Sequence, residues 1–298
     1  MKKIAIIGAN SYIARNMCTV IEKKYDKYDI YLYDRAEKQV DGRENYKSID
    51  VLDKKSLENI DFDCDYIYLF VGKTGTANGF DVYDEFINVN EIALLNILSI
   101  HREKKSKAKI IFPSTRLVYK GVEGLLNENS EKEFNTVYAV NKFACEMYLE
   151  QYRKVFDINY CIFRICVPYG TLIENASSYG TAEFMIKSAK EKGMISLYGD
   201  GEVRRTLTHM EDLCNILVKY GVSDACINDV FNVGGEDYSL KEMANMIANK
   251  YSASIDFVPY PELARKIESG STVFDDGKLQ SIDAYAFKHQ FEDWCKKS

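Results

Sequence analysis

Features that mark several specialised classes of protein are missing from this sequence. Lys and Arg total 39 against 45 Asp and Glu, and the two signs are mixed along the chain. Nucleic-acid-binding proteins usually carry a basic surface, so this balance argues against a nucleic-acid partner. No apolar run approaches the roughly 20 residues that span a bilayer. The first apolar stretch runs directly into Gly8 and Ser11, which indicates a strand and a turn rather than a secretion signal.

Metal-binding patterns are also missing. The chain has only three histidines, and none of its eight cysteines forms a C-x-x-C pair. No His/Cys cluster has zinc spacing, so we expect no metal site. Cys161 and Cys166 lie in apolar runs, where a thiol is usually a small buried hydrophobe. Free thiols in this number are typical of a reducing compartment, which predicts a cytoplasmic protein.

What the chain does contain is an alternation of strands and helices. Strands are predicted at 3–7, 29–33, 46–49, 65–71, 109–112 and 159–167. Helices are predicted at 11–24, 54–59, 83–104 and 135–155. This order implies crossover connections and a parallel sheet covered on both faces. The fold class is therefore α/β, a Rossmann-like doubly wound parallel sheet.

The alternation ends after Tyr169 and Gly170, where loop and helix replace it. We expect residues 1–168 to form a Rossmann domain that binds the dinucleotide, with a returning strand near 229–234. Residues 169–298, including a helix at 239–250, are expected to form mainly a smaller C-terminal substrate-binding lobe. No proline-rich linker separates the two parts, so we expect them to pack directly together.

The turn after the first strand indicates a dinucleotide site. Gly8 lets the chain turn sharply, so that the next helix points its N-terminal N–H groups at a pyrophosphate. Only Gly8 remains of the usual glycine pattern, because Ser11 and Ala14 occupy the other two positions. Ser11 can still donate to phosphate. The cofactor-binding residues expected here are Gly8, Asn10, Ser11, Tyr12 and Ile13.

The end of the second strand indicates which dinucleotide binds. Asp34 stands where a carboxylate binds the ribose hydroxyls of NAD and repels a 2′-phosphate. Arg35, its neighbour, would instead accept that phosphate. NAD is therefore the expected cofactor, with NADP as the alternative, and a solvated surface Asp–Arg pair is a third interpretation.

Tyr138 and Lys142 form a Y-x-x-x-K pair near the start of a predicted helix, on one face and a turn apart. A phenol is a poor base at neutral pH, but a nearby ammonium favours the phenolate. Tyr138 would then take a proton from a substrate hydroxyl. Thr115 follows the fifth strand, and ligands of open α/β sheets bind at the carboxyl ends of strands. We therefore expect Thr115, Tyr138 and Lys142 in one cleft.

Together these motifs make the chain resemble an extended short-chain dehydrogenase/reductase of the nucleotide-sugar epimerase/dehydratase group. The resemblance runs from Gly8 to about Gly234. Besides the residues above, it rests on Asp50-Val51, Asn90, the 113–119 stretch, the 163–170 strand, Gly199-Asp200-Gly201, Arg205, Asp212 and the 231–234 strand.

The resemblance implies roles for further residues. Thr115 would supply the catalytic hydroxyl. Cofactor contacts would come from Asp50, Val51, Val71, Gly72, Lys73 and Asn90, and also from Tyr138 and Lys142. Substrate contacts would come from Thr115, Arg116, Tyr169 and Arg205. For two of these residues an alternative stays open. Arg205 would form a lobe-bridging salt bridge, for instance with Asp212, in place of the substrate contact. Lys73 would be a solvated surface lysine in place of the cofactor contact. The implied substrate is a nucleotide-diphosphate sugar, and the implied assembly is a homodimer built on the helices at 83–104 and 135–155.

Departures from the family pattern lie on the substrate side. The family's 4,6-dehydratases carry an Asp and a Glu where this chain has Arg116 and Leu117. Neither residue can perform the elimination, so we predict that the protein is not a 4,6-dehydratase. Arg116 would pair with a charged sugar substituent such as a carboxylate, or face solvent. Val167 and Thr206 replace a family Asn and Asp, so no particular sugar is assigned.

The sequence leaves three functions open. The first is an NAD-dependent nucleotide-sugar epimerase that acts at carbon 4 through a transient keto sugar. The second is an NAD(P)-dependent nucleotide-sugar 4-dehydrogenase or 4-ketoreductase. The third is a dinucleotide-binding regulator without catalysis, which the retained Tyr138, Lys142 and Thr115 disfavour.

Overall fold

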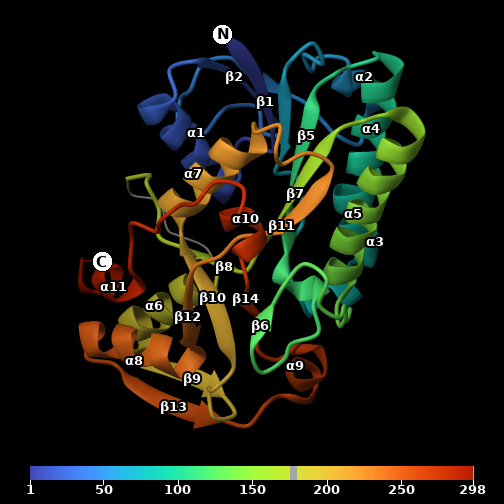
Figure 1. Ribbon diagram of the computed structural model, residues 1–298. Helices are drawn as coiled ribbons and strands as arrows, with labels where there is room; N and C mark the ends of the chain where they lie inside the picture. The colour runs from blue at the N-terminus through green and yellow to red at the C-terminus, as the bar shows by residue number, and fades with distance from the viewer. Residues whose placement is uncertain (175–179, 298) are drawn as a thin grey trace.

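The computed structural model describes residues 1–174 and 180–297, and its largest element is a parallel sheet (Figure 1). Seven strands of the described residues lie in the order β11-β7-β5-β4-β1-β2-β3, and every neighbouring pair is parallel. They are β1 (Lys2–Ile7), β2 (Tyr28–Asp34), β3 (Tyr46–Ser48), β4 (Tyr66–Leu69), β5 (Lys109–Thr115), β7 (Tyr160–Ile165) and β11 (Asp229–Asn232). The predicted α/β class and doubly wound sheet are confirmed.

Helices cover both faces of this sheet (Figure 1). α1 (Tyr12–Lys24) and α7 (Met210–Gly221) pack on one face, and α4 (Ala93–Glu103) and α5 (Val137–Phe156) pack on the other. Strands between two helical layers have no solvent face, which explains why residues 4–7 of β1 are all fully buried. The sheet core is therefore apolar on both sides.

The predicted helix at 83–104 is interrupted in its middle. The structure divides it into α3 (Tyr83–Phe86), a π-helical segment η2 (Ile87–Ile92) and α4. Asn90 lies in the widened segment, and its carbonyl oxygen accepts a hydrogen bond from the Cys145 thiol of α5 at 3.2 Å. Such π-helical turns are frequent at functional sites. Periodicity alone did not reveal this one, because tertiary contacts hold it.

The predicted strand at 159–167 is also divided. β7 ends at Ile165, and β8 (Val167–Tyr169) joins a second sheet beside β10 (Arg204–His209). β8 is an edge strand of that sheet, where Pro168 is tolerated because it has no N–H to donate to a further neighbour. The chain therefore leaves the large sheet at Cys166, which lies beside the ends of both sheets.

The smaller sheets and their helices form the lower part of the molecule in Figure 1. β10 pairs with β8 and β12 (Glu236–Ser239), β9 (Met194–Tyr198) with β13 (Ser254–Val258), and β6 (Leu125–Leu126) with β14 (Val273–Phe274). The helices here are α6 (Thr181–Lys192), α8 (Leu240–Tyr251) and α11 (Phe291–Lys297). α7 and β11 come from the same part of the chain but return to the large sheet.

Short helical segments complete the described elements: α2 (Lys54–Leu57), η1 (Asn78–Phe80), η3 (Arg116–Val118), α9 (Glu262–Ile267) and α10 (Gly277–Gln280). Among the helices that the structure describes, none combines the length and the apolar character needed to cross a bilayer.

Candidate active site

A cavity of about 520 Å³ lies where the order of the large sheet reverses, at the carboxyl ends of β1, β4 and β5. Open α/β sheets bind ligands at this switch point because the chain diverges there. The predicted site residues that line the cavity are Ser11, Tyr12, Ile13, Val71, Gly72, Thr115, Arg116, Tyr138 and Lys142. Residues of the expected dinucleotide site and of the expected catalytic group therefore line one cavity, although they are far apart in the sequence.

Lys142 lies on α5 at the cavity wall. Its Nζ donates a hydrogen bond of 2.9 Å to the Pro113 carbonyl oxygen and lies 4.3 Å from the centre of the Phe112 ring. Burial lowers the pKa of Lys142 to about 8. The amine is therefore still mainly protonated at neutral pH. A cation in this position favours the phenolate of a tyrosine one helical turn away.

Tyr138 and Thr115 are held by local helix-start geometry. Thr136 precedes α5 and caps it: its hydroxyl accepts the Ala139 N–H at 3.1 Å, which puts Tyr138 in the first turn of the helix. Thr115 is the last residue of β5, and its Oγ1 accepts the Leu117 N–H at 3.3 Å. Both side chains line the cavity with Lys142. Their joint action on one substrate hydroxyl stays a prediction.

The start of α1 fits a dinucleotide pyrophosphate. Gly8 has φ +85°, and a Cβ there would lie 2.6 Å from the Phe70 carbonyl carbon, so the close approach of β1 to the end of β4 requires glycine. The Ser11 hydroxyl is buried and has no hydrogen-bond partner among the described residues. A buried hydroxyl without a partner is costly unless a ligand supplies one. Ser11 lines the cavity at the helix N-terminus, where an anion is favoured.

The predicted adenosine contacts lie outside the cavity. Asp34 accepts the Asn10 backbone N–H at 2.9 Å, so it orders the loop after β1. The Asn10 side chain donates a hydrogen bond to the Lys38 carbonyl oxygen and accepts one from the Val40 N–H. Asn10 therefore orders this loop. Arg35 is exposed. Whether these residues choose NAD over NADP stays a prediction.

Asp50 and Val51 follow β3. Asp50 is exposed and accepts the Leu52 N–H at 2.9 Å. The Val51 carbonyl oxygen accepts a hydrogen bond of 3.1 Å from Asn96 of α4. The two residues therefore lie near the surface beside the sheet. Their contact with adenine stays a prediction.

Asn90 fixes the loop that follows β4. Its Oδ1 accepts the Lys73 N–H at 2.8 Å, and its Nδ2 donates to the Lys73 carbonyl at 3.1 Å. A Cβ on Gly72 would lie 3.2 Å from the Asn90 oxygen, so glycine allows this close approach. The Lys73 ammonium forms an ion pair with Glu85. Asn90 therefore positions backbone at the cavity wall, while the Lys73 side chain pairs away from it.

Two predicted substrate residues lie away from the cavity. Tyr169 is fully buried against Phe291 and Trp294, and its hydroxyl donates to Glu236 at 3.1 Å. Arg205 is also buried and pairs with Glu268 at 2.6 Å. The salt bridge considered for Arg205 thus exists, but with Glu268 rather than Asp212. Direct substrate contacts by Tyr169 and Arg205 stay predictions.

Glu146 is a site residue that sequence reasoning missed. Its carboxylate forms a buried pair with Arg164, with a closest N–O distance of 2.5 Å, and accepts the Ser114 hydroxyl. Its charge also favours the protonated form of Lys142, partly offsetting burial. The signal was its spacing: Tyr138, Lys142 and Glu146 follow each other at intervals of four, on one helix face.

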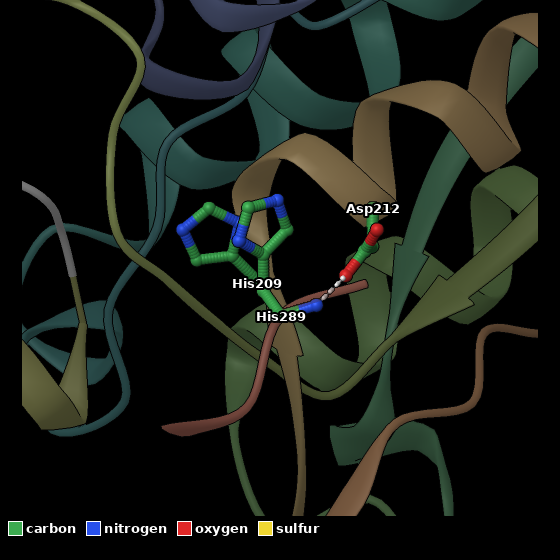
Figure 2. Close-up of side chains that lie close together, drawn as sticks. All are labelled: His209, Asp212 and His289. Carbon is green, nitrogen blue, oxygen red and sulfur yellow. Dashed lines mark hydrogen bonds between the residues drawn. The ribbon is translucent and has the colours of Figure 1, made fainter. Parts of the chain in front are cut away.

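His209, Asp212 and His289 come closest to a metal-ligand arrangement among the described residues, with one ligand atom of each within 4.8 Å of the others. The two imidazole rings stack, 3.9 Å apart and tilted by 28°. Asp212 is directed at the backbone N–H of His289, at 3.1 Å (Figure 2). The cluster connects the start of α7 to the C-terminal segment.

A parallel sheet in this order, with a cavity at its switch point and a helix N-terminus beside it, defines a dinucleotide-binding α/β protein. Residues 4–234 match the sequence profile of the NAD dependent epimerase/dehydratase family, and the chain belongs to that family. This confirms the predicted membership of the extended short-chain dehydrogenase/reductases, and it confirms NAD as the expected cofactor.

The similar proteins include both epimerases and a dehydratase. A putative UDP-glucose 4-epimerase of Methanocaldococcus jannaschii is 22% identical, covering 83% of this chain and 82% of that protein. The dTDP-glucose 4,6-dehydratase of Bacillus anthracis, solved with NAD, is 19% identical with a TM-score of 0.84, covering 100% and 95% of the two chains. The UDP-glucose 4-epimerase of Thermus thermophilus, also solved with NAD, is 18% identical with a TM-score of 0.82, covering 99% and 96%. These two structures share the fold of this chain.

Proposed function

We propose that the protein is an NAD-dependent nucleotide-sugar epimerase that inverts carbon 4 through a transient keto sugar. The observation that carries the proposal is that one cavity joins Thr115, Tyr138 and Lys142 to the start of α1. Relatives named as UDP-glucose 4-epimerases support the choice of reaction. The substrate would be a nucleotide-diphosphate sugar, held between the large sheet and the residues 169–298 that we assign mainly to a substrate-binding lobe.

In the proposed mechanism, the protein's own residues handle the proton. Tyr138 removes it from the sugar hydroxyl as a general base and returns it after inversion. Lys142 stabilises the phenolate by its charge, and Thr115 hydrogen-bonds the same sugar oxygen. Bound NAD supplies reversible hydride transfer. The residues placed to hold it are Ser11 at the α1 N-terminus and the Gly72 backbone that Asn90 positions.

We further propose that the protein does not catalyse 4,6-dehydration. The two positions after Thr115 both line the cavity, and they carry the guanidinium of Arg116 and the alkyl chain of Leu117. Elimination of water needs an acid and a base beside the sugar. No Asp or Glu is among the described residues that line the cavity.

The assembly and location are proposals as well. Tyr83 and Ile87 at the start of the α3–η2–α4 run, and Val140 and Met147 on α5, are large apolar residues that are 58%, 39%, 49% and 37% exposed. Exposed apolar surface on adjacent helices is typical of a protein interface. We propose a homodimer built on these helices. Eight free cysteines, seven of them buried, support a reducing, cytoplasmic environment.

One assay separates the candidate reactions. Purified protein is denatured, the released dinucleotide is identified, and fresh protein is incubated with UDP-, GDP-, CDP- and dTDP-sugars. We expect NAD, and an epimeric sugar without net change in NADH absorbance. A stoichiometric change in NADH would instead establish the dehydrogenase or ketoreductase. A sugar product that is lighter than its substrate by one water would overturn the exclusion of dehydration. Bound dinucleotide without any turnover would favour the regulator.

A further inference from the structure

Arg116 places a positive charge on the cavity wall with little to compensate it. The residue lines the cavity and is half-buried. An arginine carries five N–H donors. Among the described residues, the only hydrogen bond of this guanidinium joins Nη1 to the Ser269 hydroxyl, at 3.1 Å. Most of its donors are therefore available to a ligand in the cavity.

The surrounding charges make this cation less stable rather than more. Burial and the nearby Arg205 guanidinium lower the pKa of Arg116 to about 10. Glu268 is the carboxylate that favours the charged form of Arg116, but it already pairs with Arg205 at 2.6 Å and accepts the Gly270 N–H at 3.0 Å. The group of Arg116, Arg205 and Glu268 thus keeps a net charge of +1 next to the cavity.

The cavity wall as a whole also has an excess of positive charge. Its described lining residues include two cations, Arg116 and Lys142, and no carboxylate. Lys142 is directed at the Pro113 carbonyl and belongs with Tyr138. A charge that is partly removed from water is stabilised by an anionic partner. The cavity therefore favours a ligand that brings such a partner to Arg116.

We propose that Arg116 binds a carboxylate on the sugar ring, so that the substrate is an acidic sugar, a nucleotide-linked uronic acid. This inference rests on the proposed function, since it assumes that a nucleotide sugar occupies the cavity. Arg116 directly follows Thr115, and consecutive Cα atoms are only about 3.8 Å apart. The guanidinium therefore starts from the same strand end as the hydroxyl that meets the reacting oxygen.

The position of the acid on the sugar follows from this adjacency. In a hexopyranose that reacts at carbon 4, the diphosphate is attached at carbon 1, across the ring. The substituent at carbon 5 is next to the reacting carbon, and in a uronic acid it is a carboxylate. The planar guanidinium can form two parallel hydrogen bonds with that group. The diphosphate is the other anion of the substrate, and the experiment distinguishes the two.

The test compares sugar nucleotides that differ only in this group. Purified NAD-loaded protein is assayed with UDP-glucose and UDP-glucuronate, dTDP-glucose and dTDP-glucuronate, and GDP-mannose and GDP-mannuronate. The measured quantity is the ratio of kcat/KM for the acidic to the neutral sugar of each pair. In at least one pair we expect the wild type to prefer the acid, and Arg116→Gln to lower the ratio by about tenfold or more, the scale of a hydrogen bond to a charged group.

Two further variants test the specificity of this effect. Arg116→Lys keeps the charge without the planar fork, so we expect it to keep part of the preference. Arg204→Gln removes a guanidinium that pairs with Asp237 at 2.8 Å on the lobe surface, and we expect it to keep the full ratio. Circular dichroism of Arg116→Gln shows whether that variant itself is folded.

Each of the following results would overturn the inference. A wild type that prefers the neutral sugar, or neither sugar, in every pair would exclude carboxylate recognition. An Arg116→Gln variant that loses both sugars equally would assign the guanidinium to the diphosphate. If neutral sugars are epimerised while the acidic ones are ignored, the proposed function stands and only this inference fails. If the wild type turns over no sugar nucleotide, both fail.

Discussion

At the residue scale, the environment of Lys142 sets the chemistry of the cavity. Burial lowers the pKa of Lys142 to about 8, while the charge of Glu146 on the next turn of α5 partly offsets this. An amine that remained in water would be a weaker influence on Tyr138, because solvent screens exposed charges. Above about pH 8 the Lys142 amine is mostly neutral. Below that pH it carries a charge whose influence on Tyr138 is little screened by solvent.

The role of Tyr138 predicts a selective loss of turnover. We expect Tyr138→Phe to retain NAD and to lower kcat about 100-fold or more, because the variant lacks the group that exchanges a proton with the sugar. Steady-state kinetics and calorimetry with NAD measure the two effects. Tyr148→Phe is the matched control, since Tyr148 is on the same helix but donates to Glu91 at 2.9 Å. Near-normal turnover of Tyr138→Phe would exclude the mechanism.

At the element scale, a buried polar network joins α5 to the strands that form the cavity. Glu146 of α5 pairs with Arg164 of β7 and accepts the hydroxyl of Ser114 in β5. Arg164 also donates to the Tyr119 hydroxyl at 2.7 Å, which in turn donates to Asn232 of β11. The network therefore fixes α5, which carries Tyr138 and Lys142, against three neighbouring strands.

Removing one partner from this network should be costly. We expect Glu146→Ala to lower the free energy of unfolding by about 3–5 kcal/mol, because it leaves the Arg164 charge buried without its partner. Urea unfolding followed by circular dichroism measures the change. Glu150→Ala is the matched control one turn further along α5, where an exposed pair with Lys154 is worth only about 0.3–0.5 kcal/mol. Equal effects of the two substitutions would show that the network adds little stability.

The junction between α7 and the C-terminal segment predicts acid sensitivity. Burial and the neighbouring His289 lower the pKa of His209 to about 4, against 6.5 for an ordinary histidine. Between these values the unfolded chain binds the proton and the folded chain does not. Stability is therefore present above about pH 6.5 and is lost as the pH falls toward 4, by up to about 1.4 kcal/mol per pH unit.

The histidine can be tested by its own removal. Urea unfolding of the wild type and of His209→Gln is measured at pH 7 and pH 5. Because glutamine does not titrate, we expect the variant to lose less stability than the wild type between the two values. An identical loss would mean that other groups cause the acid sensitivity.

At the scale of the whole molecule, the large sheet and the segment that leads to the smaller sheets share the cavity, and helices beside it carry exposed apolar side chains. The cavity wall includes residues from β1 to β5 ends and from the segment around Pro168 that leads into the smaller sheets. α5 and the α3–η2–α4 run carry site residues on their inner sides, Lys142 and Asn90. A second copy on their outer sides would stiffen these helices without entering the cavity.

The dimer proposal predicts that a charge on α5 separates the copies. We expect the wild type to have the mass of a dimer in light scattering, and Val140→Lys to shift it toward the monomer, because the new charge would be buried at the interface. Phe184→Lys is the matched control, since Phe184 is 67% exposed on α6 of the smaller lobe. A monomeric wild type at working concentration would refute the dimer.

The order of strands and the residues at their ends could be read from the sequence. Short apolar runs predict β1 and β5, and an apolar face of helical period predicts α1. Gly8 and Thr115 follow from the turns at the strand ends. Periodicity did not predict the π-helical turn at Asn90 or the break at Cys166. Both depend on partners distant in sequence: Lys73 and Cys145 for Asn90, and the β10 strand for the residues after Cys166.

The sequence by itself determined the family, the parallel sheet and the residue types that its chemistry needs, because these depend on local patterns and on short motifs. Only the tertiary structure decided which of those residues share the cavity. It brought Ser11, Thr115, Arg116, Tyr138 and Lys142 together there, and it buried Tyr169 and Arg205 among partners of their own. Those outcomes depend on packing and ion pairing between segments as far apart as β10 and the loop at Glu268, which no local pattern records.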